Sequence, residues 1–536
     1  MTLARKILIA IAGLIVLLIL LNYGASYYIS KRLPSILHAE KDFPYNISYD
    51  DLDINLLTGS LTAHNAYIAP KDSTSTALKK GLFGKVKKVQ VRHCDLWALL
   101  RTDKIIVKAV VLDTPEAILY ESKKKYNVED DFVKPFKKTI RTGSVEVIDG
   151  NFKMLDTMQR IAVKASNIDF KILDIKVDSA TVEQNIPVKY SDYKFTCDSV
   201  FYRMDNVYNV TASRVINSDT SMVVSNVKLI PKYTRASFTK NIGLEKDLFT
   251  ITVKTINLPK VEWGYLKDIL YVHAPTVSLN NVYANVYRNK IPKDDPSVKK
   301  MYSELLRSLK FDLKADRVLV KNSQIVYEEQ NNFSVPPGKV TFSNFYGTLH
   351  NVYSPVNKGK LPNTVIDAQC MFMKATPLKA TWTFNTLNKS DSFTFTGSLQ
   401  SIRIEQINAI SNPLMNINAK GLITKLRFTI NGNRNNATGS FAIDYDDLKV
   451  EVLEDDRKGK KRLLSAIGNL FIKNDSDEKL KQTSIQVTRA KDKSFFNFLW
   501  LCMQDGLRKA ILPKFVEKRL PEVKPPREDK KKKKDD

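Results

Sequence analysis

Apolar and polar residues alternate along most of this chain. In "YDDLDINLL" (49–57) every second residue is apolar, and "YDDLKVEVL" (445–453) repeats that phrase about 400 residues later. A period of two places apolar side chains on one face of a β-strand and polar ones on the other. Similar segments rich in Val, Ile, Thr, Tyr and Phe follow one another, broken by Asn, Asp, Gly and Pro. The pattern predicts a mostly β protein with about 25 to 30 strands.

Two blocks of this pattern occur twice in the same order. "VEVIDGNFKMLD" (145–156) aligns with "VLVKNSQIVYEE" (318–329), and each predicts a hairpin with a tight turn at Asp149-Gly150 or Asn322-Ser323. Upstream, "VKKVQVRHCDLWALL" (86–100) resembles "VKTINLPKVEWGYL" (253–266). The shared order favours an internal duplication over chance similarity of amphipathic strands.

Helical spacing appears in two segments. Residues 294–311 carry an apolar stripe, and Pro296 suits a first helical turn. Residues 494–513 predict an amphipathic helix that Ser494 caps and Pro513 ends. Two readings of this helix stay open: it closes the end of a sheet, or it contacts a bilayer or a membrane partner. Its predicted apolar face consists of Phe495, Phe498, Leu499, Cys502, Met503, Leu507 and Ile511.

The first segment predicts a membrane anchor. Residues 7–29 carry no charge, which is long enough to cross a hydrocarbon core of about 30 Å. Arg5 and Lys6 precede the segment, and three tyrosines follow its apolar part. We expect an uncleaved anchor rather than a signal peptide, with the amino terminus in the cytoplasm and the body outside it. The anchor residues include Ile7, Leu14, Leu21 and Ile29.

Composition narrows the class of partner. Lys and Arg number 84 against 57 Asp and Glu, giving a net charge of +27, which favours anionic partners such as lipid surfaces. Nucleic acid is disfavoured because the predicted anchor places the basic body outside the cytoplasm. Residues 514–536 predict a disordered basic tail.

The sequence offers little for catalysis. Asp51 and Asp53 form a D-x-D, but alternation places both on the polar face of a strand, without a nucleotide-binding pattern around them. His93, Cys94 and Asp95 follow one another in a predicted strand, so neighbouring side chains point to opposite faces and do not converge on one substrate atom. The four cysteines and five histidines show no metal-ligand spacing. We therefore expect no enzyme activity, no catalytic residues, no metal and no cofactor.

So many one-sided strands with so few helices predict a curled sheet. If the sheet closes incompletely, its apolar side stays open and fits lipid tails. At about 4.8 Å between strands, about 25 strands would extend on the order of 120 Å. The predicted lining of this groove is Leu52, Ile54, Leu56, Val145, Val147, Phe152, Met154, Val318, Val320, Ile325, Tyr327, Leu448, Val450 and Val452.

Several segments carry a family resemblance. The anchor followed by "ISYDDLDINLLTGSLTAHNAYI" (47–68), the element at 139–156, and the late segments at 373–399 and 418–453 together resemble AsmA-like proteins. The resemblance covers most of residues 1–512 as a diffuse pattern. It implies a single-pass protein of the bacterial inner membrane, with a long periplasmic β-groove similar to bridge-like lipid transfer proteins. The implied role lies in the cell envelope, in phospholipid movement towards the outer membrane.

The expected fold is an N-terminal transmembrane helix followed by an elongated, curled antiparallel β-sheet groove (β-taco-like). The expected function is non-enzymatic binding and transfer of phospholipid acyl chains, with phospholipid, the inner membrane and an outer-membrane or envelope protein as partners. The alternative is an envelope assembly or scaffold protein, active in outer-membrane biogenesis, that works through protein contacts. The expected organisation is an anchor at 1–30, groove parts at 31–250 and 251–493, the helix at 494–513 and the tail at 514–536.

Overall fold

The structure of this chain is a computed structural model. It describes residues 45–71, 81–95, 98, 104–121, 139–182, 186, 188–266, 269–356, 359–454, 475–476 and 480–512. The predicted anchor at 7–29 and the predicted tail at 514–536 lie outside these residues. Among the described helices, none is both long and apolar enough to cross a bilayer.

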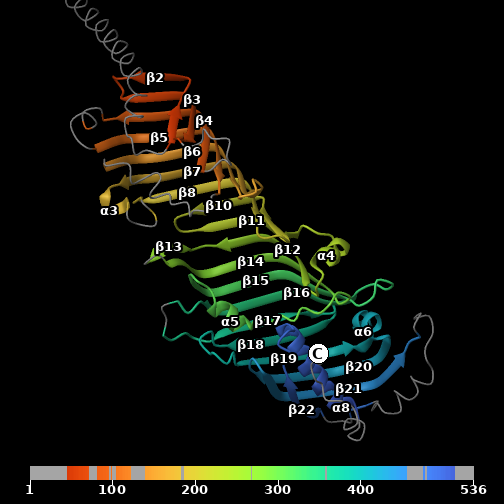
Figure 1. The fold of residues 1–536 in the computed structure, drawn as a ribbon. Coiled ribbons are helices and arrows are strands. Elements are labelled where there is room, and N and C mark those ends of the chain that lie inside the picture. Colours follow the sequence, from red (N-terminus) through yellow and green to blue (C-terminus); the bar gives the residue numbers. More distant parts are fainter. Residues whose placement is uncertain are drawn as a thin grey trace, which may run out of the picture. The chain divides into compact units, whose positions relative to one another are not determined.

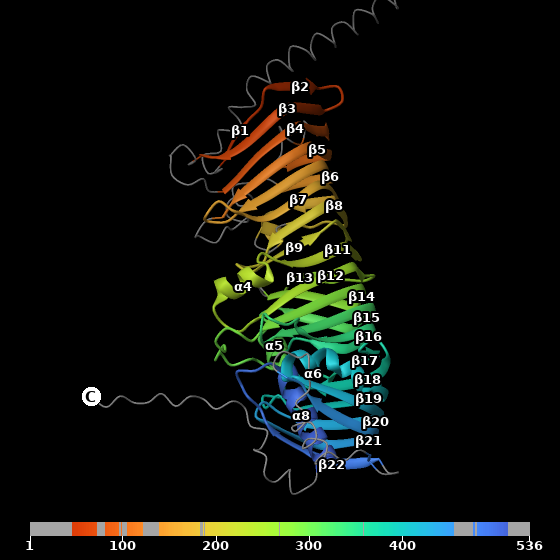
Figure 2. The ribbon, with the colours of Figure 1, turned by 90° about the vertical axis from the view of Figure 1, so that its right-hand side faces the viewer.

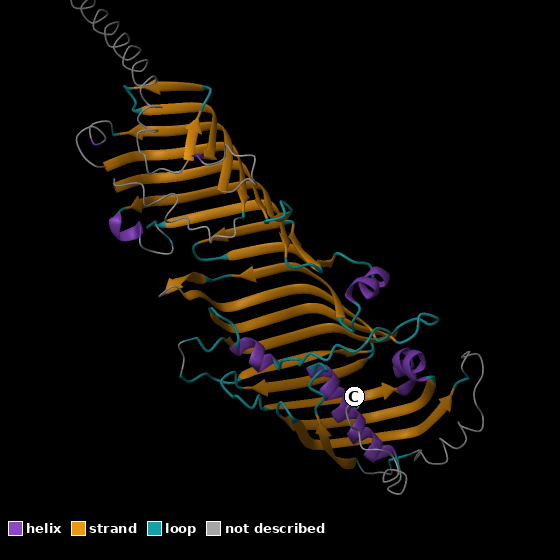
Figure 3. Ribbon diagram, viewed as in Figure 1, coloured by secondary structure: helices purple, strands orange, loops and turns teal. Residues whose placement is uncertain are grey.

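The chain divides into two compact units. Unit 1 runs to Asn226 and unit 2 begins at Val227, except that residues 264–268 group with unit 1. Strands dominate both units (Figure 3), so the prediction of a mostly β protein is confirmed. Because the boundary runs through β11 (Met222–Pro231) and β13 (Glu262–Leu266), each unit is described by itself.

Unit 1 is built on one continuous run of paired strands, coloured red to yellow in Figure 1. β1 and β2 both pair with β3, β3 to β8 pair in chain order, and β8 also pairs with β9 and β10. The elements are β1 (Tyr45–Ser48), β2 (Asp51–Asn55), β3 (Ser60–Pro70), β4 (Gly81–Cys94), β5 (Lys104–Tyr120), β6 (Thr139–Leu155), β7 (Ile161–Val177), α3 (Ser179–Val182), β8 (Asp192–Arg203), β9 (Tyr208–Ala212) and β10 (Arg214–Ser218).

Unit 2 repeats this plan and adds helices. β12 pairs with β14, and β14 to β22 then pair in chain order. The strands are β12 (Asp247–Leu258), β14 (Ile269–Asn289), β15 (Asp312–Gln330), β16 (Gly338–Tyr353), β17 (Thr364–Phe372), β18 (Thr376–Phe384), β19 (Phe393–Arg403), β20 (Ile417–Gly432), β21 (Asn436–Val452) and β22 (Lys481–Thr488). The helices are α4 (Arg235–Ile242), α5 (Tyr302–Arg307), the 3-10 helix η3 (Ile404–Ile407), α6 (Asn408–Met415) and α8 (Phe495–Ile511).

The expectation of a purely antiparallel sheet is wrong. β5 and β6 run parallel in unit 1, and β14 and β15 run parallel in unit 2. In both places the strands are joined by a long connection, residues 121–138 or 290–311, which leaves room for a crossover. The sheet is therefore mixed.

The internal duplication predicted from sequence has a structural counterpart. Each unit contains an antiparallel pair, then a parallel crossover, then a second antiparallel pair: β4–β5–β6–β7 in unit 1 and β12–β14–β15–β16 in unit 2. Residues with left-handed backbone conformation recur at corresponding positions of these strands. The matching pairs are Thr114 and Asn281, Asp149 and Asn322, Asn167 and Asn344, and Asp174 and Asn351.

The predicted hairpins at 145–156 and 318–329 are wrong, because residues 145–155 belong to the single strand β6 and residues 318–329 to the single strand β15. Asp149 (φ 52°) and Asn322 (φ 50°) are left-handed residues at register shifts in β6 and β15. Such a bulge adds one residue, bends the strand and increases its twist. It also shifts the apolar alternation by one position. A turn between two strands causes the same shift, so the two look alike in the sequence.

The two predicted helices differ in outcome. Within 294–311 only α5 (Tyr302–Arg307) is helical, so the prediction there is too long and Pro296 lies outside the helix. The helix predicted from 494 is confirmed as α8, and the Ser494 hydroxyl accepts a hydrogen bond from the Asn497 amide at 3.2 Å.

α8 lies against the last strands of unit 2 (Figures 1 and 2). On β22 the Gln486 amide donates to the Asp505 carboxylate at 2.9 Å, and the Thr483 hydroxyl donates to the Gly506 carbonyl at 3.1 Å. The helix thus supplies hydrogen-bond partners to the last strand of the described sheet, the kind of strand whose open edge otherwise invites pairing with another chain.

Candidate functional site

The predicted groove residues of β6 lie on one face of unit 1. Val145 and Val147 share that face by alternation, as do Gly150, Phe152 and Met154 beyond the bulge. The two groups are joined across the bulge: a Cβ placed on Gly150 would lie 2.8 Å from Cγ1 of Val147. The left-handed residue therefore keeps apolar side chains on one side of the strand while the strand bends.

Strand register extends this face from β3 to β8. Residues paired directly across neighbouring strands project to the same side, and three rows of such residues run across the strands. The rows are Ala63–Val89–Leu112–Val147–Phe170–Phe195, then Leu61–Val91–Val110–Val145–Ile172–Tyr193, and Ile68–Gly84–Ala117–Phe152–Ala165–Val200. We call these rows the unit 1 apolar face.

The apolar face continues onto β2. Leu52 pairs with Ala63, and Ile54 pairs with Leu61, so both predicted lining residues lie on it. Leu56 falls in the turn after β2, outside the strand. The face therefore spans seven strands, from β2 to β8.

Most side chains of the unit 1 apolar face are neither buried nor fully exposed. Leu112, Val147, Phe152 and Phe170 are all half-buried. The buried hydrophobic cluster of the described structure consists of unit 2 residues alone. A contiguous, incompletely covered apolar surface of this kind is typical of interaction or ligand-binding sites.

The opposite face of the same strands is more polar, although Val111 on it is only 3% exposed. The row Thr62–Gln90–Val111–Glu146–Lys171–Lys194 alternates with the apolar rows. Lys171 Nζ lies 2.7 Å from the Glu146 carboxylate on this side. Together with the side-chain hydrogen bond, this ion pair holds the pKa of Glu146 below its usual range, against the opposing effect of burial. The two faces of unit 1 thus differ clearly in chemistry.

In unit 2 the predicted lining residues also share one face. Val318 and Val320 pair with Leu349 and Gly347, and Ile325 and Tyr327 pair with Phe342 and Val340. From Val318 the row continues through Leu349, Ile366, Trp382, Phe395 and Ile430. Leu448 belongs to the buried cluster on this face, and Val450 and Val452 follow it in β21 at the same period.

Helices cover this apolar face at the carboxyl-terminal strands of unit 2. Phe498 is 1% exposed, and Phe495 stacks on Trp382 with ring centroids 4.3 Å apart. On the strand side, Ile430 and Phe441 are at most 1% exposed. The face is therefore a packed core here, whereas the unit 1 apolar face is only half-buried.

The predicted apolar face of α8 contributes to that core. Phe495, Phe498, Leu499 and Cys502 are buried, and Met503, Leu507 and Ile511 pack against the same cluster. This packing agrees with the interpretation in which the helix closes the end of a sheet. The aromatic residues that α8 exposes are Phe496 and Trp500, at 61% and 48%.

Two buried ionic clusters tie the covering segments to the sheet. The Asp391 carboxylate has no exposed surface and accepts from Arg307 at 2.7 Å, Ser303 at 2.8 Å and Arg434 at 2.6 Å. Burial alone would raise the pKa of Asp391, but these hydrogen bonds outweigh it and hold the pKa below its usual value. Lys493, just before α8, is also buried, and its amine lies 3.5 Å from the buried Glu245 carboxylate and 2.9 Å from the half-exposed Asp294 carboxylate.

The structure places the catalytic candidates that the sequence analysis considered. The described side chains contain no group of three His, Cys, Asp or Glu that could hold a metal ion. Asp51 and Asp53 are exposed on β2, and Asp53 faces His64 at 3.5 Å. The Asp95 carboxylate accepts from the Ala98 amide instead of pointing to a shared site with Cys94.

Two buried thiols have raised pKa values. Burial raises the pKa of Cys370 to about 11, and burial with the nearby Asp505 carboxylate raises that of Cys502 to about 12. Both stay protonated at neutral pH, and it is the thiolate that reacts.

Comparison with known proteins assigns this chain to no family. No protein-family model matches the chain, and no curated protein matches its sequence. The resemblance to AsmA-like proteins therefore stays a prediction from sequence.

Proposed function

We propose that this protein binds and transfers lipid without covalent chemistry, with acyl chains lying on the unit 1 apolar face. The observation that carries the proposal is the continuity of this half-buried face over seven strands. At about 4.8 Å between strands, six intervals span about 29 Å. The ~30 Å hydrocarbon core of a bilayer holds two leaflets of acyl chains, so one extended acyl chain, about half that length, fits along the face.

The chemistry of the face suits an acyl chain and little else. Leu112, Val147 and Phe170 offer no hydrogen bond, so a ligand held there must itself be apolar along its length. Each methylene removed from water contributes about 0.8 kcal/mol, and the neighbouring rows let a chain shift without meeting a polar barrier. A surface of this kind supports movement along the sheet as well as binding.

The remaining parts of the proposal rest on the sequence. The uncharged segment at 7–29 would anchor the chain in an inner membrane, and the basic excess would favour anionic headgroups near the body. In this arrangement the β-rich body lies in the periplasm and acts between envelope membranes. A reporter that is active only in the periplasm, fused after residue 512, tests the orientation: loss of its signal would contradict it.

Site-specific photocrosslinking tests the lipid contact directly. A benzophenone side chain placed at Phe152 or Phe170 of the full chain should yield lipid adducts after irradiation in bacterial cells, detected by mass spectrometry. The same probe at Lys171, the neighbour of Phe170 on the polar face, is the matched control. Equal adducts at Phe170 and Lys171, or none at Phe152 and Phe170, would refute the proposal.

A pair of charge substitutions gives an independent measurement. Val147→Glu places a carboxylate on the apolar face, while Ile148→Glu places one on the opposite face, where Ile148 is already 46% exposed. We expect co-purifying phospholipid to fall severalfold for Val147→Glu and to stay unchanged for Ile148→Glu. Circular dichroism of both variants shows whether the fold is retained.

The assembly or scaffold alternative is favoured by one observation. The apolar face at the end of unit 2 is filled by the chain's own side chains, as in a protein that works through its surface. A full chain that purifies without lipid and gives no adduct at Phe152 or Phe170 would support this second function.

A further inference from the structure

A hollow lies on unit 2, on the face opposite α8. Its volume is about 730 Å³, and residues of β15 to β20 line it. Thr381 alternates with Trp382 in β18, and Thr429 alternates with Phe428 and Ile430 in β20. Since Trp382 and Ile430 face the α8-covered core, the lining threonines project to the other side of the sheet. The polar side chains of the hollow thus lie on the face opposite the α8-covered core, while Val320 and Phe428 of the apolar face reach its lining between them.

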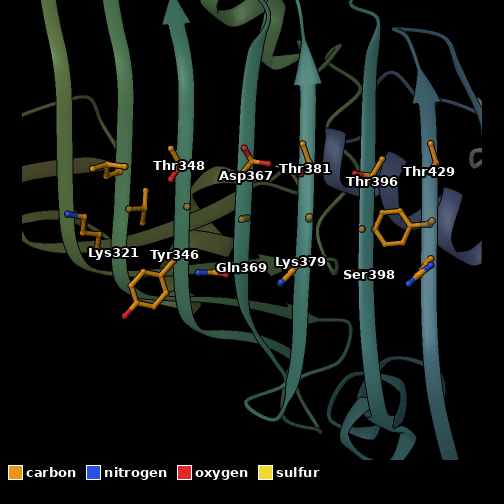
Figure 4. Close-up of a pocket in the computed structure, with 18 residues that line it drawn as sticks. Lys321, Tyr346, Thr348, Asp367, Gln369, Lys379, Thr381, Thr396, Ser398 and Thr429 are labelled. Atoms are coloured by element: carbon orange, nitrogen blue, oxygen red, sulfur yellow. Dashed lines mark hydrogen bonds between the residues drawn. The ribbon is translucent and has the colours of Figure 1, made fainter.

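Strand register arranges the polar residues of the lining in two rows, with Gly347, Ala368, Ala380 and Gly397 between them (Figure 4). The first row is Thr348–Asp367–Thr381–Thr396–Thr429, and the second is Tyr346–Gln369–Lys379–Ser398–Arg427. Both cross five strands, so each spans about 19 Å at a spacing of about 4.8 Å. The hollow is therefore long enough for an extended ligand that lies across the strands.

The charges in the hollow do not cancel. Lys321, Lys379 and Arg427 line it, against the single carboxylate of Asp367. That carboxylate accepts a hydrogen bond from the Thr381 hydroxyl at 2.7 Å. Within the described ranges, no ion pair or hydrogen bond joins the three cations to another side chain. Unpaired cations next to one satisfied carboxylate leave an excess of positive charge that favours an anionic ligand.

Hydroxyl groups outnumber the cations. Thr348, Thr381, Thr396, Thr429 and Ser398 each carry one, and each can both donate and accept a hydrogen bond. Tyr346 adds a 40% exposed ring, whose orientation is held by a hydrogen bond from its hydroxyl to the Asn322 side chain. A row of hydroxyls beside a fixed aromatic ring complements a ligand that is itself rich in hydroxyls and has flat apolar ring faces.

We propose that this hollow binds an acidic oligosaccharide. Sugar hydroxyls pair with the threonine row, one ring packs on Tyr346, and carboxylate, sulfate or phosphate groups meet Lys321, Lys379 and Arg427. A nucleic acid strand fits less well, because the lining offers one aromatic ring where successive bases need several. The hollow shares no residue with the unit 1 apolar face, so the two sites can be tested separately.

Calorimetry on the full chain, purified in a mild detergent, tests the proposal. The probes are an oligogalacturonate, a neutral malto-oligosaccharide of equal length and a single-stranded DNA of equal net charge. We expect the oligogalacturonate to bind about tenfold or more tightly than the neutral sugar, with affinity that falls as salt rises. Tighter binding of the DNA, or no binding of the oligogalacturonate, would overturn the proposal. Vesicles that carry an acidic glycolipid show whether the same sugar chemistry is recognised on a membrane.

Matched variants locate the site. The double substitution Lys379→Glu/Arg427→Glu should weaken oligogalacturonate binding by about tenfold or more, because it reverses two charges at the second row. The control Lys339→Glu/Lys420→Glu changes the net charge equally at exposed residues outside the hollow, and it should leave affinity nearly unchanged. If both double variants lose the same affinity for oligogalacturonate, binding depends on net charge alone and the proposed site is refuted.

A third variant addresses the hydroxyl row without altering charge. Thr396→Val keeps the shape of the side chain and removes its hydroxyl. We expect a severalfold weaker affinity with an unchanged salt dependence. An unchanged affinity would contradict the role given to the threonines, even if the charge variants fail to fold.

Discussion

Removing the Phe498 ring tests whether α8 belongs to the core of unit 2. Phe498 is 1% exposed and lies edge-on to Phe393 with ring centroids 6.2 Å apart. Truncation of a buried phenylalanine to alanine typically costs about 3–5 kcal/mol, through lost burial and the cavity that remains. Against a total stability of about 5–15 kcal/mol, Phe498→Ala should destabilise unit 2 severely.

Urea unfolding followed by tryptophan fluorescence measures this change. Trp382 is a reporter inside the affected core, because it stacks on Phe495 next to Phe498. With a slope of about 2–3 kcal/mol per M, a loss of about 4 kcal/mol lowers the midpoint by about 1–2 M. In amide hydrogen exchange, the backbone amides of β18 to β22 should exchange faster in Phe498→Ala than in the unaltered chain.

The neighbouring aromatic residue provides the control. Phe496 is 61% exposed on the same helix, so Phe496→Ala should change stability by no more than about 0.5 kcal/mol. If both variants unfold at the midpoint of the unaltered chain, α8 does not pack on this sheet, and the reading of the helix as a membrane-surface element regains support.

Three further substitutions probe the fold. Asp391→Asn removes the charge that Arg307 and Arg434 share, and should cost about 3 kcal/mol in urea unfolding. Because the pKa of Asp391 in the folded protein lies below its ordinary value of about 3.9, its contribution to stability is present above about pH 4 and is lost as the pH falls further. An unfolding midpoint that does not change with acid would contradict this assignment. Asn322→Val forces a β-branched residue into the left-handed region and should cost about 1–2 kcal/mol in thermal unfolding, whereas Asn322→Gly should be tolerated. Gly506→Val would bring a Cβ to 2.5 Å from Cγ of Phe441 and should cost about 1–3 kcal/mol, a result that near-native stability in the same assay would exclude.

Alternation alone predicted which residues share a face. The period of two in 145–147 and 318–320 correctly placed those valines together, because side-chain direction in a strand follows from local geometry. It failed at Asp149-Gly150, where the apolar phase shifts by one residue. A turn and a left-handed bulge produce the same shift, and only the pairing with β7 distinguishes them.

Other features depend on residues far apart in sequence. Parallel pairing of β5 with β6 was missed because the connection, not the strands, sets their direction. The covered end of unit 2 depends on Trp382 meeting Phe495, 113 positions later in the chain. The hollow opposite α8 was also missed, since it appears only once the registers of β15 to β20 are aligned. The sequence shows that every second residue of these strands is polar. It does not show how those residues align from one strand to the next.

The contact between α8 and β22 has a consequence for solubility. A sheet end with free amides can template the addition of strands from other molecules, which is how fibres start. In this protein the Asp505 carboxylate already accepts the Gln486 amide of β22. Loss of the helix by proteolysis would uncover a seeding edge, so truncated chains should form fibrils while the intact protein stays dispersed.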